Sequence, residues 1–130
     1  MTRLAFDPNA SLLVFPCLVE YRRRILLDLA LDTGASTTII SIKAAREIGY
    51  DLSQISDLVS FADASKTHLV PGVTLKSLSF ADARIEDIEA LCYTIPEEHG
   101  IDGVMGLNFL RHFNISLDFE RGMLTLNHFG

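Results

Sequence analysis

The tripeptide Asp32-Thr33-Gly34 follows an apolar run and places a carboxylate, a hydroxyl and a glycine at one point of the chain. A carboxylate at the end of an apolar strand can be reached by solvent and by backbone donors, as general acid–base chemistry requires. The glycine permits a close approach of the turn, and the Thr33 hydroxyl can bind neighbouring backbone. Because Asp, Thr and Gly are also favoured in turns, the tripeptide taken alone is better described as a turn that ends a strand.

The sequence excludes several other catalytic sites. The segment that begins at Gly34 is not a nucleophile elbow, because Thr38 occupies the position of the second glycine in Gly-x-Ser-x-Gly. The chain contains no Gly-Lys-Ser/Thr phosphate loop and no Cys-x-x-Cys pair, and its histidines do not pair at a metal-ligand spacing. Its glycine-rich stretch over residues 100–106 lacks the spacing of a dinucleotide-binding loop.

One acidic segment could be drawn as a metal site. It contains Glu97, Glu98, His99 and Asp102. A solvated acidic loop is the better description of these four residues. We therefore expect no metal and no cofactor.

The length and charge of the chain limit its class. With 130 residues, 48% of them hydrophobic, the sequence predicts one globular domain over residues 1–130, with a core over about 12–126. The formal net charge of −6 argues against binding to nucleic acid or to an anionic membrane. The only basic run, residues 22–24, reads as a solvated hairpin turn.

The cysteines and the N-terminal residues suggest a reducing compartment. Cys17 and Cys92 are too few for a disulfide framework and lie in apolar segments, where single thiols usually behave as small buried hydrophobes. The longest uncharged run near the N-terminus is too short to span a bilayer. We therefore expect a cytoplasmic protein.

The residues around Asp32 predict the elements that position it. Leu12–Glu20 and Ile25–Leu31 are apolar runs separated by the arginines, a pattern typical of a β-hairpin. In the second run the leucines at 27, 29 and 31 share one face, while residues 28, 30 and 32 share the other. Asp32 is therefore expected at the strand end, pointing away from the leucine face. A second short strand is predicted over Thr37–Ile40.

The rest of the chain predicts a mostly β domain with one or two short helices. Ser41 is expected to cap a helix that Gly49 ends. The expected elements are a hairpin of 59–61 with 67–70, a turn at Pro71-Gly72, strands over 73–80 and 85–95, one short helix over 106–112 that ends at Asn114, and a hairpin of 115–119 with 123–126.

A second segment gives Asp32-Thr33-Gly34 a family context. About seventy residues downstream lies Gly103-Val104-Met105-Gly106-Leu107-Asn108-Phe109-Leu110. Taken alone, this segment describes a strand that runs into a buried helix. With both motifs in this order, the chain resembles the retropepsin-like aspartic proteases over about Leu12–Leu126, in particular their cellular and bacterial single-domain members. The resemblance implies a closed β-barrel or sandwich of the acid protease fold.

The resemblance also implies a mechanism and a stoichiometry. Aspartic proteases use two carboxylates, which share one proton and activate one water against a peptide carbonyl. Because this chain holds a single Asp-Thr-Gly, activity would require a homodimer in which each protomer contributes Asp32. The implied partners are thus a peptide or protein substrate and a second copy of the chain.

The family pattern assigns roles to further residues as expectations. Thr33 would bind into the partner's catalytic loop, and the Gly34 carbonyl would face substrate. The other expected substrate contacts are Ala35 and Ser36 in the loop and Ala62, Asp63, Ala64 and Ser65 in a flap. The residues expected to pack behind the loop are Val104, Met105 and Gly106. An ordinary surface hairpin remains an alternative for the flap, because its tip contains no glycine.

The chain departs from other members of the family at three loop and helix positions. Ser36 and Leu107 stand where viral members typically carry an acidic residue and an arginine that pair near the dimer contact. The loss of both is coherent, since losing one would leave a partly buried charge unpaired. Ala35 offers no hydroxyl to the carboxylate, and we therefore expect a pH optimum that is less acid-shifted than in members with serine there.

Two other function classes remain open from the sequence. One is a catalytically silent protein-binding or dimerisation module on the same fold. The other is a small β-barrel that binds a ligand and carries Asp-Thr-Gly by chance, which would be monomeric with an enclosed apolar cavity. The opening residues before Leu12 and the tail over 127–130 are candidates for strand exchange in a dimer.

Overall fold

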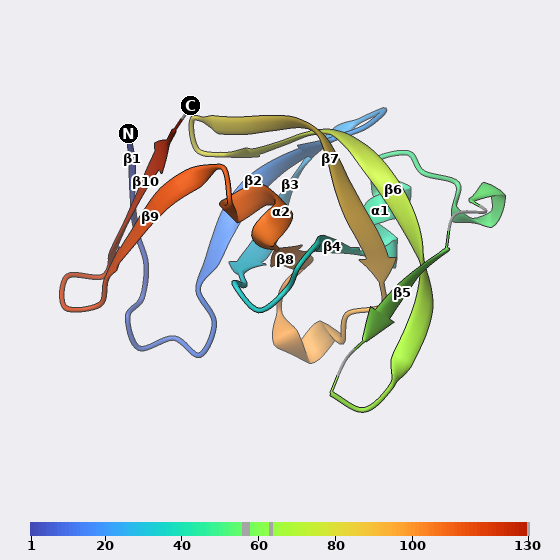
Figure 1. Ribbon diagram of the computed structural model, residues 1–130, viewed down its shortest axis with the longest axis horizontal. Helices are drawn as coiled ribbons and strands as arrows, with labels where there is room; N and C mark the ends of the chain where they lie inside the picture. The colour runs from blue at the N-terminus through green and yellow to red at the C-terminus, as the bar shows by residue number, and fades with distance from the viewer. Residues whose placement is uncertain (56–57, 63, 130) are drawn as a thin grey trace.

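The protein forms a β-barrel with a smaller terminal sheet beside it (Figure 1). The structure is a computed structural model that describes residues 1–55, 58–62 and 64–129. The strands are β1 Thr2–Ala5, β2 Val14–Glu20, β3 Arg24–Leu31, β4 Thr38–Ser41, β5 Leu58–Ala62, β6 Thr67–Phe80, β7 Ala83–Tyr93, β8 Gly103–Met105, β9 Phe113–Asp118 and β10 Met123–His128. The helices are α1 Ile42–Glu47 and α2 Leu107–Leu110, with single 3-10 turns at η1 Leu52–Gln54 and η2 Glu97–His99.

Six strands close the barrel in the order β2-β3-β8-β4-β7-β6, because β6 also pairs with β2. Within the described part of the chain, strand β5 pairs with β6 alone and extends the sheet outside this ring. The short strand β8 lies between β3, to which it is parallel, and β4, to which it is antiparallel. This insertion brings residues 103–105 beside the end of β3. The expected mostly β fold with two short helices is confirmed.

The core fills the barrel from the predicted apolar faces. Leu27 and Leu29 of β3 are buried, whereas Asp28 between them is exposed, as the alternation predicts. Cys17 and Cys92 are buried and unpaired, which confirms their prediction as core thiols. The largest fully buried side chains come from β2, β3, β4, β6, β8, β10 and the two helical regions: Phe15, Phe80, Phe109, Leu29, Ile40, Ile48, Leu75, Leu78, Met105, Leu124, Leu126 and Val19.

Helix α1 begins and ends where its cap residues predict. The Ser41 hydroxyl accepts a hydrogen bond from the Ala44 amide at 2.9 Å, which satisfies one of the free donors of the first turn. After the helix, Gly49 adopts a φ of +112°, a backbone conformation that favours glycine.

Two predicted boundaries are wrong. Pro71-Gly72 is not a turn but lies inside β6. Pro71 forms the last pair with β5, opposite Leu58, and Gly72 begins the pairing with β7, opposite Leu91. The proline therefore occupies the point where one ladder ends and the other begins, where a missing amide is tolerated. The second helix is also shorter than expected, because the chain enters β9 at Phe113 to pair with β10.

The terminal sheet includes a strand that the sequence did not suggest. Strand β1 pairs antiparallel with β10 from Thr2↔Leu126 to Ala5↔Met123, and β10 also pairs with β9. Both edges of β10 are thus occupied within one chain. In Figure 1 this sheet lies at the left of the barrel, with both termini at its upper end.

Candidate active site

Asp32 lies at the end of β3, in the loop that leads to β4. Its amide donates a hydrogen bond to the Met105 carbonyl at 3.1 Å, which ties the loop to β8. Its carboxylate oxygen Oδ1 accepts a hydrogen bond from the Gly34 amide at 2.9 Å. The Asp32 side chain is half-buried, whereas Thr33 and Gly34 are exposed. The carboxylate is therefore fixed by its own turn while it remains open to solvent.

Strand β8 fits between its neighbours because its first residue, Gly103, and the residue that follows the strand, Gly106, are glycines. A Cβ on Gly103 would lie 2.0 Å from the Ile39 carbonyl oxygen, and a Cβ on Gly106 would lie 2.5 Å from the carbonyl carbon of Thr37. Both distances are shorter than real Cβ atoms allow. Glycine at these two positions lets the backbones of β4 and β8 approach closely beside the Asp32 loop.

Helix α2 binds the far side of the same loop. The Leu107 amide donates to the Ala35 carbonyl at 2.8 Å, and the Asn108 amide donates to the Ser36 carbonyl at 3.2 Å. The first amides of a helix lack partners within the helix, and here they satisfy loop carbonyls. The two predicted motifs thus meet along the whole loop, with Val104 of β8 paired to both Ala30 and Ile39.

Asn108 and Thr38 were missed as site-forming residues. The Thr38 amide and hydroxyl each donate to Asn108 Oδ1 at 2.8 Å, and the Thr38 hydroxyl accepts a hydrogen bond from the Gly106 amide at 3.1 Å. Asn108 Nδ2 donates to the Glu89 carbonyl at 2.7 Å. A signal was present: Asn108 is the one polar side chain within an apolar segment, and a polar group in such a segment needs partners.

A second apolar cluster connects the β5–β6 hairpin with the strands beside Asp32. Its buried members are Ile39, Val70 and Leu91, and it includes the partly buried Phe61, Tyr93, Ile95 and Val104. The Phe61 ring lies 5.2 Å from the Tyr93 ring, and the Tyr93 hydroxyl lies 3.3 Å from His68 Nε2. This cluster supports the base of the hairpin on the face of the sheet opposite the main core.

The predicted flap residues lie at the end of this hairpin. Val59–Phe61 and Thr67–Val70 pair as expected, and the last pair is Ala62↔Thr67. Ala62, Ala64 and Ser65 are exposed, and Asp63 lies outside the described residues. In Figure 1 the hairpin tip and the loop between β3 and β4 both reach toward the lower part of the view. Whether the hairpin closes over a substrate stays a prediction.

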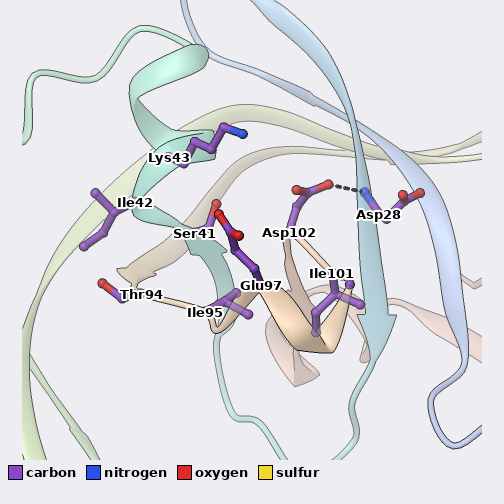
Figure 2. Close-up of a pocket in the computed structure, with 10 residues that line it drawn as sticks. Asp28, Ser41, Ile42, Lys43, Thr94, Ile95, Glu97, Ile101 and Asp102 are labelled. Carbon is purple, nitrogen blue, oxygen red and sulfur yellow. Dashed lines mark hydrogen bonds between the residues drawn. The ribbon is translucent and has the colours of Figure 1, made fainter.

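A separate open pocket of about 430 Å³ lies farther along the same strands (Figure 2). Asp102 forms part of its wall and accepts a hydrogen bond from the Asp28 amide at 2.8 Å, while its own amide donates to the Asp28 carbonyl at 2.8 Å. The Ser41 amide donates to the Asp102 carbonyl at 2.7 Å. Asp102 therefore joins β3 to β4 at the entry to β8 and is not simply solvated.

The acidic loop beside this pocket is otherwise exposed. Glu97, Glu98 and His99 form η2 and are all exposed. Among residues 1–55, 58–62 and 64–129, no three His, Cys, Asp or Glu side chains are grouped so that they could hold a metal ion. In the same described residues, no helix is long and apolar enough to cross a membrane.

Comparisons with known proteins bear on this arrangement. A family model described as "Aspartyl protease" matches residues 25–109, which include Asp32-Thr33-Gly34 and the second motif up to Phe109. No curated protein matches the chain in sequence. A retropepsin-like aspartic protease from Rickettsia conorii has a similar fold, with a TM-score of 0.77 and 18% identity over 98% of this chain and 89% of that one. The EIAV protease, solved with the inhibitor HBY-793, gives a TM-score of 0.59 and 14% identity over 79% of this chain and 88% of its own.

Proposed function

The chain belongs to the aspartyl protease family, and we propose that it is an endopeptidase whose active unit is a homodimer. The observation that carries the proposal is the position of Asp32. Its backbone is bound to Met105, its carboxylate accepts the Gly34 amide, and helix α2 binds the loop that follows. The retropepsin-like fold supports the same proposal. The requirement for a dimer follows from the single Asp-Thr-Gly in the chain, because the reaction needs two carboxylates.

In the proposed mechanism, the two Asp32 carboxylates face one water across the two-fold axis and share one proton. The ionised carboxylate accepts a proton from the water as its oxygen attacks the peptide carbonyl carbon. The protonated carboxylate donates a hydrogen bond to the carbonyl oxygen and stabilises the charge that develops there. When the tetrahedral intermediate collapses, the C–N bond breaks, and the amine leaves with a proton from the pair.

The substrate in this proposal is an extended peptide. Thr33 would bind into the partner's loop, while Gly34, Ala35 and Ser36 would contact the peptide backbone. The hairpin that includes Ala62, Asp63, Ala64 and Ser65 would close over it and pair with it as an added strand. The support for an apolar preference near the cleaved bond is the partly buried cluster of Phe61, Tyr93 and Val104 between hairpin and β8.

The test compares the wild type with Asp32→Asn on a mixture of unstructured peptides between about pH 3 and 8. Because Asn cannot accept the proton of the water, we expect a loss on the order of 10³-fold or more. Sedimentation analysis must show the variant in the same oligomeric state as the wild type. Equal cleavage by both proteins would contradict the hypothesis that this protein is an aspartic endopeptidase. It would favour the catalytically silent binding module instead.

Dilution gives an independent test of the dimer. If each active unit contains two chains, the activity per chain falls when the protein is diluted below its dissociation constant. An activity per chain that is constant over a hundredfold dilution, together with a monomer mass, would contradict the shared site.

A further inference from the structure

Asp32 and Val104 lie on the same face of the barrel sheet. Leu31 packs against the main core and pairs with Met105, which is part of that core. Because successive residues of a strand point to opposite faces, Asp32 after Leu31 and Val104 before Met105 both point away from the main core. Val104 there belongs to the second apolar cluster, which the β5–β6 hairpin covers. The hairpin therefore covers the face of the sheet that carries Asp32.

Phe61 reaches this face from the β5–β6 hairpin. It is partly buried, whereas Ser60 and Ala62 on either side of it are exposed, as alternation along a strand requires. Its ring lies 5.2 Å from the Tyr93 ring, and both rings pack against the buried residues of the cluster. His68 pairs with Phe61 across the hairpin, and its ring lies 6.2 Å away. Contacts from β6 and β7 thus hold the Phe61 ring over the sheet.

We propose that Phe61, packed with Tyr93 and Val104 on the face that carries Asp32, limits the substrate to small apolar side chains, such as alanine, at one position near the cleaved bond. The inference rests on the proposed function, in which an extended peptide lies between the hairpin and the sheet. Side chains of an extended peptide point alternately to two sides, so one of them near the cleaved bond points toward the Phe61 ring.

The cost of moving the ring sets the limit. A large side chain can enter this space only if Phe61 leaves Tyr93 and the cluster, and the loss of those contacts opposes binding. A side chain the size of alanine does not require that movement. When Phe61 is replaced by a smaller residue, a large apolar side chain of the substrate can bury its own surface against the same cluster.

The experiment uses pairs of unstructured peptides that differ at one position near the cleaved bond, where one member carries alanine and the other phenylalanine. The kcat/KM is measured for each pair with the wild type, Phe61→Leu and Phe61→Ala. At one position we expect the wild type to prefer alanine by about 10-fold or more. The preference should fall in Phe61→Leu and fall further, or reverse, in Phe61→Ala. Phe61→Leu keeps an apolar contact with the cluster and carries the test if Phe61→Ala does not fold.

The matched control is Leu69→Ala. Leu69 pairs with Ser60 on the opposite face of the same hairpin and is 69% exposed. This variant removes an apolar side chain from the hairpin but leaves the Phe61 ring over the sheet, so its preference should equal that of the wild type. Urea unfolding identifies the variants that are folded.

The results separate the size limit from the proposed function. A wild type that cleaves peptides without a preference for alanine, or with a preference that both Phe61 variants retain, overturns the size limit alone. An equal loss of kcat/KM on both members of each pair also overturns it, because a merely structural role of Phe61 would weaken cleavage of all peptides alike.

A wild type that cleaves none of the peptides contradicts the proposed function instead. Binding of the same peptides, labelled and followed by fluorescence anisotropy, then tests the size limit by itself. Tighter binding of a phenylalanine peptide by Phe61→Ala than by the wild type supports a groove whose width Phe61 sets. Equal binding by the two proteins, or no binding by either, overturns the size limit as well.

Discussion

The side chain of Asn108 accepts two hydrogen bonds from Thr38, one from its amide and one from its hydroxyl, both at 2.8 Å. This pair joins helix α2 to the first residue of β4, and the Asn108 amide group continues the connection to Glu89 of β7. Thr38 is fully buried, and its hydroxyl also accepts the Gly106 amide. The loop between Asp32 and Thr38 is therefore held at its far end by a fully satisfied polar network.

Thr38→Val should destabilise the protein and lower its activity. The substitution keeps the volume but removes the hydroxyl, which leaves the buried Gly106 amide without its partner and costs about 1–3 kcal/mol of unfolding free energy. Urea unfolding measures this cost. The control Thr38→Ser retains the hydroxyl and should lose less. An equal loss in both variants would mean that packing of the methyl group, and not the network, stabilises this site.

Gly106→Ala should be much more damaging than an alanine at an open glycine. A Cβ at position 106 would lie 2.5–2.8 Å from backbone atoms of Thr37 and Thr38, so the strand or the loop must shift, at a cost of about 3 kcal/mol. At Gly100 a Cβ has no neighbour within 4 Å, and only the φ of +66° opposes alanine, at about 1 kcal/mol. Thermal unfolding of the two variants measures the difference. Equal losses would show that β8 and β4 can separate without cost.

Stability should fall at alkaline pH because two thiols are buried. Burial, with a smaller contribution from Asp28, raises the pKa of Cys17 from 9.0 to about 12, and burial raises the pKa of Cys92 to about 11. Since the folded pKa values lie above the unfolded ones, this stability is fully present below pH 9 and is lost as pH rises toward 11 and 12.

Each thiol should contribute up to about 1.4 kcal/mol per pH unit within that window. The measurement is the urea midpoint between about pH 8 and 10.5 for the wild type and for Cys92→Ala. The variant starts less stable but should lose stability less steeply as pH rises. Parallel curves for the two proteins would contradict the assignment of the loss to the Cys92 thiol.

The pH optimum of the proposed protease should lie above about 3, given the ordinary pKa of ~3.9 for an aspartate. Ala35 follows Gly34 in the loop and offers the Asp32 carboxylate no hydroxyl. A hydroxyl that donates to the ionised form would favour ionisation, so Ala35→Ser should move the acidic limb of the pH–activity profile to lower pH. A wild-type profile that peaks below about 3 would contradict this expectation.

The local elements around Asp32 were predictable because each has a local cause. Alternation in β3 placed Leu27, Asp28 and Leu29 correctly but not Ala30, which is also buried, and the Ser41 cap predicted the start of α1. Pro71 was misassigned for the opposite reason. From the sequence alone, Pro-Gly predicts a turn. Its place inside β6 depends on two partner strands, because pairing with β5 ends at Pro71 and pairing with β7 begins at Gly72.

The candidate site was predictable in part. The order of Asp32-Thr33-Gly34 and the segment over 103–110 pointed to a family in which the two meet, but the sequence did not indicate which atoms join them. The bonds from Asp32 to Met105 and from Leu107 to Ala35 depend on β8 lying between β3 and β4. The role of Asn108 depends on the same insertion, since its partners Thr38 and Glu89 are distant in the chain.

The sequence by itself determined the residue types, the apolar faces and the count of one acid per chain, because these follow from composition and from periods of a few residues. Only the tertiary structure decided that Thr38 and Asn108 bind each other, that Gly103 and Gly106 must lack side chains, and that β1 pairs within its own chain. These contacts join residues far apart in sequence, and they exist only after the barrel has closed.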